Sequence, residues 1–189
     1  MEIELKLALQ PRHTMRVRRH PLLNQIAPEQ RLLLSIYFDT PKFDLMRRGI
    51  ALRVRQVDDR WIQTLKAEAS SVGALSSRPE WEMAVTNGNH PDFSVLPQIA
   101  LDLLAGVKLK RIAPVFTTKF QRTTWQIGNS QAQAEVALDT GKIYAGKMHR
   151  DICEVEIELK SGAPTFLFDA ATQLLQQVSL HIEPRSKAE

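Results

Sequence analysis

The sequence predicts a strand-rich α+β fold, in which an antiparallel sheet curls into a barrel with a charged interior and helices packed on its outside. Apolar and polar residues alternate with a period of two along most of the chain, whereas the helical period of 3.6 is confined to short segments. Turn residues separate successive alternating segments, which favours antiparallel neighbours. The charges on the polar faces of the strands are sorted by sign, which is unusual for a face that simply meets water.

The length and composition are those of one globular unit. A chain of 189 residues is long enough for one well-buried domain, and we expect residues 1–189 to form it. The hydrophobic fraction of 43% and the charged fraction of 24% exclude a disordered, collagen-like or coiled-coil chain. The formal net charge of +4 favours anionic partners only weakly, because it is spread over the whole chain.

Periodicity and turn residues place the individual elements. Alternation predicts nine strands, of which one can merge with a neighbour: 2–9, 32–39, 50–57, 61–68, 80–85, 114–127, 132–138, 142–145 and 152–160. Short amphipathic segments, several of them starting at a proline, predict helices at 12–26, 42–48, 97–106 and 164–178. Residues 57–60 read as a hairpin turn, and 69–77 as a mobile loop.

Paired charges two residues apart recur on four of the predicted strands. Three strands carry acidic pairs and a fourth carries arginines: Glu2 with Glu4, Glu80 with Glu82, Glu154 with Glu156, and Arg53 with Arg55. Taken alone, any one of these strands is well explained as an amphipathic edge whose charges face water. Sorting by sign across four strands instead indicates polar faces that turn inward and apolar outer faces that the helices cover.

The single cysteine and the N-terminal sequence indicate the cellular compartment in which we expect the protein. Cys153 falls on the apolar side of strand 152–160, so we expect a buried structural thiol and not a nucleophile. One cysteine makes no internal disulfide, which fits a reducing compartment. The sequence shows no signal-peptide pattern and no apolar run near the roughly 18 residues of a membrane span. We therefore expect a cytoplasmic protein without a membrane partner.

Converging carboxylates without histidine or cysteine ligands make an all-oxygen site for a hard divalent cation, Mg²⁺ or Mn²⁺. The five histidines show no ligand spacing, so zinc is not expected. The guanidinium pair of Arg53 and Arg55 suits bidentate phosphate binding, and Lys6 and Lys66 add point charges along a polyanion. No phosphate-loop, dinucleotide-binding or nucleophile-elbow motif is present, so side chains would grip the phosphates of an oligophosphate.

A basic stretch at 12–20 raises the alternative of a nucleic-acid patch. A solvated helix face explains the stretch better, because no aromatic residues are interleaved with its arginines to stack on bases. Nucleic acid is therefore not an expected partner.

Several motifs match a known family nearly from end to end. Glu2-Ile3-Glu4-Leu5-Lys6 forms an E-x-E-x-K signature, and further matching segments are 37–41, 49–55, 64–66, 78–82, 137–141, 152–159 and the S-K-A run at 186–188. With these segments the chain resembles the CYTH superfamily of triphosphate tunnel metalloenzymes. The details look most like the bacterial inorganic triphosphatase branch, in which this domain often precedes a helical CHAD domain.

The resemblance implies an eight-stranded antiparallel tunnel and metal-dependent hydrolysis of inorganic triphosphate to diphosphate and phosphate. By position it implies metal ligands at Glu2, Glu4, Glu154 and Glu156, and catalytic residues at Glu2, Glu4, Lys6, Lys66, Glu80 and Glu82. It implies substrate-binding residues at Lys6, Arg53, Arg55, Lys66, Arg122 and Lys187, and leaves open the roles of Lys119, Glu135, Asp139 and Glu158. It also implies that residues 1–189 can be one domain excised from a longer chain with a CHAD domain.

Three alternatives remain at this point. A class IV type adenylate cyclase and a thiamine triphosphatase share the tunnel and differ in what holds the organic group. A non-catalytic module that binds polyphosphate or nucleotide is the third. The acidic pairs disfavour the module, because pure anion binding gains nothing from so many carboxylates.

Overall fold

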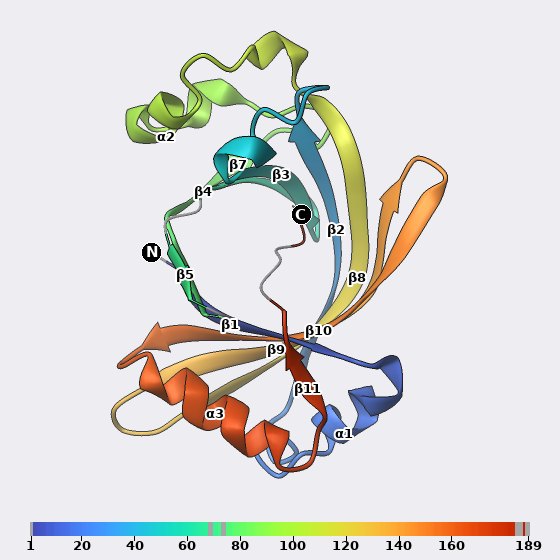
Figure 1. Cartoon of the computed structure of the whole chain (residues 1–189), viewed down its shortest axis with the longest axis vertical. Coiled ribbons are helices and arrows are strands. Elements are labelled where there is room, and N and C mark those ends of the chain that lie inside the picture. The colour runs from blue at the N-terminus through green and yellow to red at the C-terminus, as the bar shows by residue number, and fades with distance from the viewer. Residues whose placement is uncertain (1, 68–69, 73–74, 184–186, 188–189) are drawn as a thin grey trace.

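The computed structural model describes residues 2–67, 70–72, 75–183 and 187, and one large antiparallel sheet dominates it (Figure 1). The strands are β1 Glu2–Leu9, β2 Glu29–Asp39, β3 Ile50–Val57, β4 Arg60–Ala67, β5 Ser70–Val72, β6 Leu75–Arg78, β7 Glu80–Val85, β8 Ala113–Gly128, β9 Gln133–Ala145, β10 Met148–Ser161 and β11 Leu180–Ile182. The α-helices are α1 Thr14–Arg18, α2 Gln98–Leu103 and α3 Thr165–Leu175, and short 3-10 turns form at Pro11–His13, Met46–Arg48, Phe93–Val95 and Leu109–Arg111.

The sheet returns on itself through one bent segment. Its strand order is β5-β6-β1-β10-β9-β8-β2-β3-β4-β7, with β11 also on β1. β6 and β7 follow one another through Pro79, which has no N–H for a ladder; β6 pairs with β1 and β7 pairs with β4. The Ala67 N–H donates to the Pro79 carbonyl over 3.1 Å. Counting β6 and β7 as one bent strand, eight strands surround a central space, which confirms the predicted tunnel (Figure 1).

The two predicted strands at 132–138 and 142–145 form the single strand β9. The strand continues through Asp139 and Gly141, where β9 runs close against β8. A Cβ at Gly141 would lie 2.3 Å from the Lys119 carbonyl oxygen and 2.4 Å from Phe120 Cα. Only glycine permits this approach. The glycine at 141, which in the sequence is typical of a turn, therefore allows two strands to lie in close contact.

Several element predictions were wrong in extent. The helix predicted at 12–26 ends at Arg18, because Pro21 cannot continue a helical ladder and 21–25 form turns. The segment 42–48 forms only the 3-10 turn Met46–Arg48. The loop predicted at 69–77 contains β5 and most of β6, while residues 69 and 73–74 lie outside the described residues. Residue 68, placed in a strand from sequence, also lies outside them.

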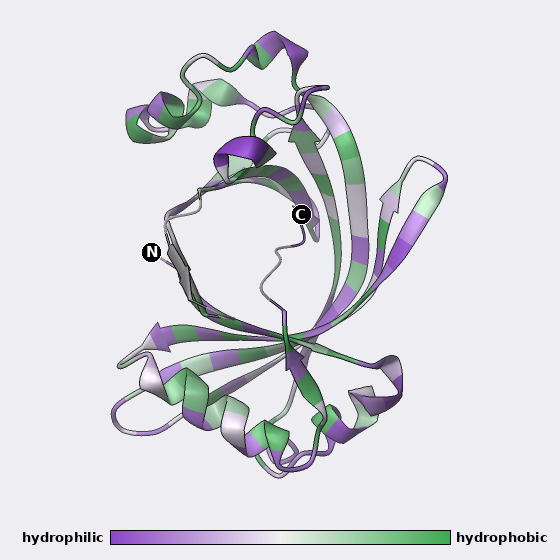
Figure 2. Cartoon of the chain, in the orientation of Figure 1, coloured by the Kyte–Doolittle hydropathy of each residue, from purple (hydrophilic) through white to green (hydrophobic). Residues whose placement is uncertain are grey.

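Helices cover the apolar outer faces of the ring, as predicted. Leu167 and Leu174 of α3 join a buried cluster with Leu5 of β1 and Val155 of β10. A second cluster joins Ala100 of α2 to the outer faces of β3 and β4. Hydrophilic and hydrophobic residues alternate along the strands, which is the pattern expected when one face is packed and the other is polar (Figure 2).

Two smaller predictions concern the thiol and the membrane. Cys153 packs against the first cluster but is half-buried, because it lies at the margin of that cluster and not within it. Burial, with Glu154 and Asp151 nearby, raises the pKa of its thiol, which agrees with an inert side chain. No helix within the described residues has the length and apolar character needed to cross a membrane.

Two adjacent leucines in α3 test the packing. Leu174 is fully buried whereas Leu175 is 48% exposed. We expect Leu174→Ala to lower the free energy of unfolding by about 2 to 5 kcal/mol, because it leaves a cavity between the helix and the sheet. Leu175→Ala should change it by less than about 0.5 kcal/mol. Urea denaturation of both variants checks this, and equal losses would contradict the observed orientation of α3.

Candidate active site

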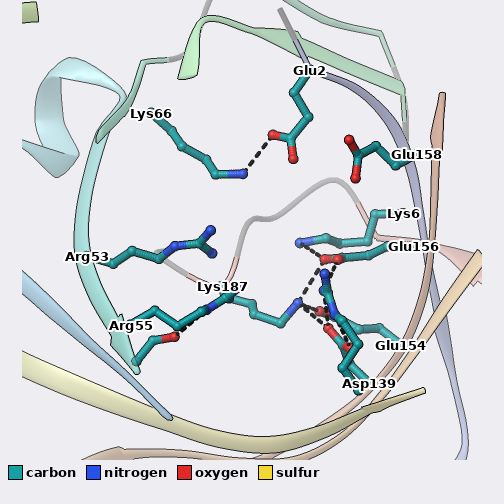
Figure 3. Close-up of polar contacts among 12 residues, drawn as sticks. Glu2, Lys6, Arg53, Arg55, Lys66, Asp139, Glu154, Glu156, Glu158 and Lys187 are labelled. Atoms are coloured by element: carbon teal, nitrogen blue, oxygen red, sulfur yellow. Dashed lines mark hydrogen bonds and ion pairs between the residues drawn. The ribbon is translucent and has the colours of Figure 1, made fainter. Parts of the chain in front are cut away.

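Alternate residues of the strands point into the space inside the ring, which we call the lumen. It contains a cavity of about 70 Å³, whose lining joins side chains from both ends of the sequence: Glu2, Glu4, Lys6, Tyr37, Ala51, Arg53, Arg55, Lys66, Arg122, Glu156 and Lys187. The charged pairs of β1, β3 and β10 therefore face inward, as their sorting by sign indicated (Figure 3). A polar lumen inside an apolar shell reverses the usual arrangement of a small barrel.

One wall of the lumen is acidic. Ligand oxygens of Asp139 on β9 and of Glu154 and Glu156 on β10 all lie within 4.8 Å of one another. The Lys187 ammonium lies among them, with its Nζ 2.8 Å from Asp139 Oδ2 and 2.8 Å from Glu156 Oε1, and it also contacts Glu154 (Figure 3). This cluster already holds a cationic group, and its all-oxygen donors suit a hard divalent cation.

Arg122 and Lys6 extend the ion pairs of this wall. Arg122 binds Asp139 through two hydrogen bonds, Nε to Oδ1 over 2.8 Å and Nη2 to Oδ2 over 2.7 Å, and also contacts Glu156. Lys6 Nζ lies 3.5 Å from Glu156 Oε1. The two carboxylates of β10 consequently differ in proton affinity.

Burial favours the protonated form of Glu156, but Lys187, Arg122 and Lys6 outweigh it and hold its pKa well below the usual range. Burial, reinforced by Glu156, raises the pKa of Glu154 although Lys187 opposes the rise. Within the wall, Glu156 is therefore the more firmly ionised carboxylate.

A second cluster forms where β1 and β7 approach β4. Lys66 Nζ lies 2.7 Å from Glu2 Oε2 and 3.0 Å from Glu80 Oε2. Arg53 Nη2 lies 3.8 Å from Glu80 Oε1 and 3.7 Å from Glu82 Oε1. Burial and the nearby Glu2 raise the pKa of Glu80 to about 7 against the opposing effect of Lys66 and Arg53. The Glu82 side chain is 53% exposed and lies nearer the solvent.

Arg55 differs from the other cations of the lumen. Its Nε donates to Ser35 Oγ over 2.9 Å, and within the described part of the chain no carboxylate lies at ion-pair distance from it. Burial, with Arg53 and Arg122 close by, lowers its pKa to about 9. Arg53 likewise has a buried Nε without a hydrogen-bond partner among the described residues. The β3 wall thus carries positive charge that is incompletely neutralised, which is the electrostatic requirement for binding an anion.

Two lumen residues were missed or left open by the sequence. Tyr37 lines the cavity and stacks on Phe116 with ring centroids 4.4 Å apart. Burial raises its pKa, but Arg53, Arg55 and Lys187 outweigh burial and lower it. Its motif, 37–41, was recognised, and strand alternation with Ser35 would have placed it inward. Asp139 belongs to the acidic wall, although it lacks an acidic neighbour two residues away.

Of the remaining open residues, Lys119 and Glu135 lie away from the cavity, whereas Glu158 faces the lumen without lining the cavity. Lys119 is exposed and alternates with Phe120, so it belongs to the outer face of β8. Glu135 accepts a hydrogen bond from Gln126 over 2.7 Å at an exposed position. Glu158 points into the same space as Glu2 (Figure 3), and its carboxylate lies 2.7 Å from Lys160 Nζ.

The fold and the lumen define a class of protein in which an antiparallel tunnel presents carboxylates on one wall and basic side chains on another. A family model described as the CYTH domain matches residues 1–189, and the chain belongs to this family. The chain is 35% identical over 188 residues to an inorganic triphosphatase from Haemophilus influenzae. That match covers 99% of this chain and 53% of the relative, so the chain spans about half the length of that curated protein.

Solved structures share the fold at low sequence identity. A Hippeastrum protein described as having a dominant triphosphatase activity aligns with a TM-score of 0.66 and 18% identity, over 99% of this chain and 93% of its own. The RNA triphosphatase domain of a mimivirus mRNA capping enzyme aligns with a TM-score of 0.55 and 13% identity, over 94% and 88% of the two chains. These likenesses establish a common tunnel architecture.

Glu80 gives the site a testable pH dependence. Its folded pKa of about 7 lies above its ordinary value of 4.5, so from about pH 4.5 upward the unfolded chain ionises first and binds fewer protons. The free energy of unfolding that neutral Glu80 contributes is therefore present below pH 4.5 and is lost as the pH rises through 7.

We expect the stability of Glu80→Gln, relative to wild type, to increase from pH 4.5 to 8. Urea denaturation in steps of pH at constant ionic strength measures this difference. A difference that stays constant across the range would show that Glu80 titrates normally.

Proposed function

We propose that this chain hydrolyses inorganic triphosphate to diphosphate and phosphate in the lumen, with Mg²⁺ or Mn²⁺ as cofactor. The observation that carries the proposal is a single cavity with incompletely neutralised guanidinium groups on one wall, Arg53 and Arg55, and a carboxylate cluster on another. The 35% identical relative named as an inorganic triphosphatase supports it. We also propose that this domain performs the same reaction as part of a longer protein, in which a CHAD domain follows it.

The metal would be held by Glu2, Glu4, Glu154 and Glu156, and we add Asp139 because its carboxylate belongs to the acidic cluster. The donor set fits the ion, because it contains only carboxylate oxygens and already accepts the Lys187 ammonium. A bound divalent ion in this class of site polarises phosphate oxygens and makes a water more acidic.

The basic side chains would bind the triphosphate along the opposite wall. Arg55 is available from the start, whereas Arg53, Arg122, Lys6, Lys66 and Lys187 lie at ion-pair distance from carboxylates in the described structure. A guanidinium group binds phosphate through two parallel hydrogen bonds, and its charge neutralises the negative charge that develops on a leaving phosphate. We propose that Arg53 and Arg55 fix the end groups of the triphosphate, and that the lysines complete its neutralisation.

Glu80 is the best candidate for moving a proton. Its pKa of about 7 is suited to a carboxylate that accepts a proton near neutral pH. The Lys66 Nζ lies 3.0 Å from Glu80 Oε2 and holds the carboxylate in place. We propose that Glu80 accepts a proton from the attacking water, while Glu82, anchored by the Thr64 hydroxyl over 3.2 Å, orients the same water from the solvent side.

A second candidate function rests on an apolar cavity of about 320 Å³ that adjoins the lumen. The two cavities share Tyr37, Ala51 and Lys187, and the larger one is lined mostly by apolar side chains such as Phe43, Met46 and Phe116. A triphosphate bound in the lumen would direct an attached organic group into it. This favours an organic triphosphate, as in a class IV type adenylate cyclase or a thiamine triphosphatase.

Removal of one carboxylate tests the metal assignment. Glu4 is 6% exposed and lines the cavity. We expect Glu4→Gln to lower kcat for triphosphate by about a hundredfold or more, because a neutral amide is a poor ligand for a hard cation. Glu29→Gln, at an exposed carboxylate paired with Arg31, is the control and should keep wild-type kinetics. Wild-type turnover in Glu4→Gln, measured as phosphate release against metal concentration, would refute the assignment.

The choice between the candidate functions depends on substrate preference. Phosphate release is measured from inorganic triphosphate, ATP and thiamine triphosphate with each metal, and cyclic AMP is assayed in the ATP reaction. We expect inorganic triphosphate to give the highest kcat/KM. A preference for an organic triphosphate, or cyclic AMP formation, would favour the second candidate. Tight triphosphate binding without turnover would identify a non-catalytic binding module.

A further inference from the structure

Phe120 of β8 lies in the wall of the lumen, where three cationic groups surround its ring. The ring centroid is 5.0 Å from Lys187 Nζ, 5.7 Å from Arg122 Cζ and 5.8 Å from Arg55 Cζ. The side chain is 1% exposed, so water does not screen these contacts. Within the described residues, every cation that lies over an aromatic ring lies over this one. Three of the proposed triphosphate-binding side chains therefore contact the same uncharged aromatic ring.

The backbone fixes the position of the ring. Phe120 is paired with Gly141 of β9, and a Cβ at Gly141 would lie 2.4 Å from both Cα and Cβ of Phe120. The side chain packs against Leu33 of β2 and Ile152 of β10 in a small buried cluster. A ring held by close strand contact on one side and packing on two others is a rigid platform.

An aromatic face suits this place for an electrostatic reason. Asp139 and Glu156 already hold Arg122 and Lys187 together, whereas no carboxylate lies at ion-pair distance from Arg55 within the described residues. A carboxylate placed beside Arg55 would neutralise the charge that an anion needs. The negative face of a benzene ring attracts cations while carrying no net charge. Arg55 depends on it most, since its described partners are the Ser35 hydroxyl and this ring.

We propose that Phe120 is a positioning residue for triphosphate binding, whose aromatic face holds Arg55 beside Arg122 and Lys187 and leaves the charge of Arg55 available to the substrate. The proposal rests on the function proposed above, because it assigns these three cations to the triphosphate. It differs from a simple packing role in one respect: a packing residue needs volume, whereas this role needs the ring's electron-rich face.

Matched substitutions separate the two roles. Phe120→Leu keeps an apolar side chain and removes the ring, whereas Phe120→Tyr keeps the ring. Leu174→Ala is the packing control, since Leu174 is fully buried in the cluster between α3 and the sheet, which does not include Phe120. Two properties are measured for each protein: binding of inorganic triphosphate by calorimetry with EDTA and no metal, and the midpoint of urea denaturation. Steady-state kinetics with metal supply KM and kcat.

We expect Phe120→Leu to weaken metal-free triphosphate binding by about five- to thirtyfold and to raise KM similarly, on the scale of one or two desolvated cation–π contacts. Phe120→Tyr should bind within about twofold of wild type. Leu174→Ala should lose stability at least as much as Phe120→Leu and still bind like wild type. This pattern would establish the positioning role.

Other patterns overturn the inference. If Phe120→Tyr binds as weakly as Phe120→Leu, or if affinity falls in step with stability in Leu174→Ala, Phe120 is a packing residue. If wild type hydrolyses triphosphate and Phe120→Leu binds it equally well, the inference fails while the proposed function stands. If wild type neither binds nor hydrolyses triphosphate, the proposed function itself has failed.

Discussion

The fold depends on compensation between charges that the ring removes from water. Burying an unpaired charge costs far more than one hydrogen bond returns, so each lumen carboxylate needs a cation close by. Different segments of the chain supply the partners: Glu2 meets Lys66, and Asp139 meets both Arg122 and Lys187. Closing the ring is therefore also what neutralises its interior. The incomplete neutralisation at Arg55 then stands out as the place that a polyanion would complete.

The alternation predicted the lumen because pairs of like charges two residues apart can be recognised in the sequence alone. Every paired charge of β1, β3, β7 and β10 that was expected to face inward lies in or beside the cavity. Asp139 escaped because it stands alone, in an Asp-Thr-Gly run whose composition is typical of a turn. Its strand continues only because Gly141 allows β8 to come close, and that is a property of the neighbouring strand. Tyr37 escaped because a tyrosine in an apolar run carries no charge to sort.

Helix lengths were the least predictable feature. The short helical segments lie on the outside of a sheet, so their extent depends on how much apolar surface needs covering and not on intrinsic propensity. α3 covers the large cluster on β1 and β10 and runs close to its predicted length, whereas the segment after Arg18 turns away at Pro21. The strands on either side of Pro79 were also hard to predict from the local sequence. Because residues 69–77 were interpreted as a loop, the sequence did not reveal that β6 before Pro79 pairs with β1 while β7 after it pairs with β4.

The short strand β11 has a role that goes beyond its three residues. β1 pairs with β10 along one side, and on its other side Glu2 to Leu5 pair with β6 while Leu7 to Leu9 pair with β11. Between them, the Lys6 carbonyl accepts a hydrogen bond from the Glu183 N–H over 3.2 Å. No stretch of β1 is left as an open edge, and open edges are where sheets of different molecules join and aggregate. Lys187, which contacts the acidic wall, follows β11 closely in the sequence. Protection of β1 against intermolecular pairing and completion of the acidic wall therefore depend on neighbouring parts of the same C-terminal sequence.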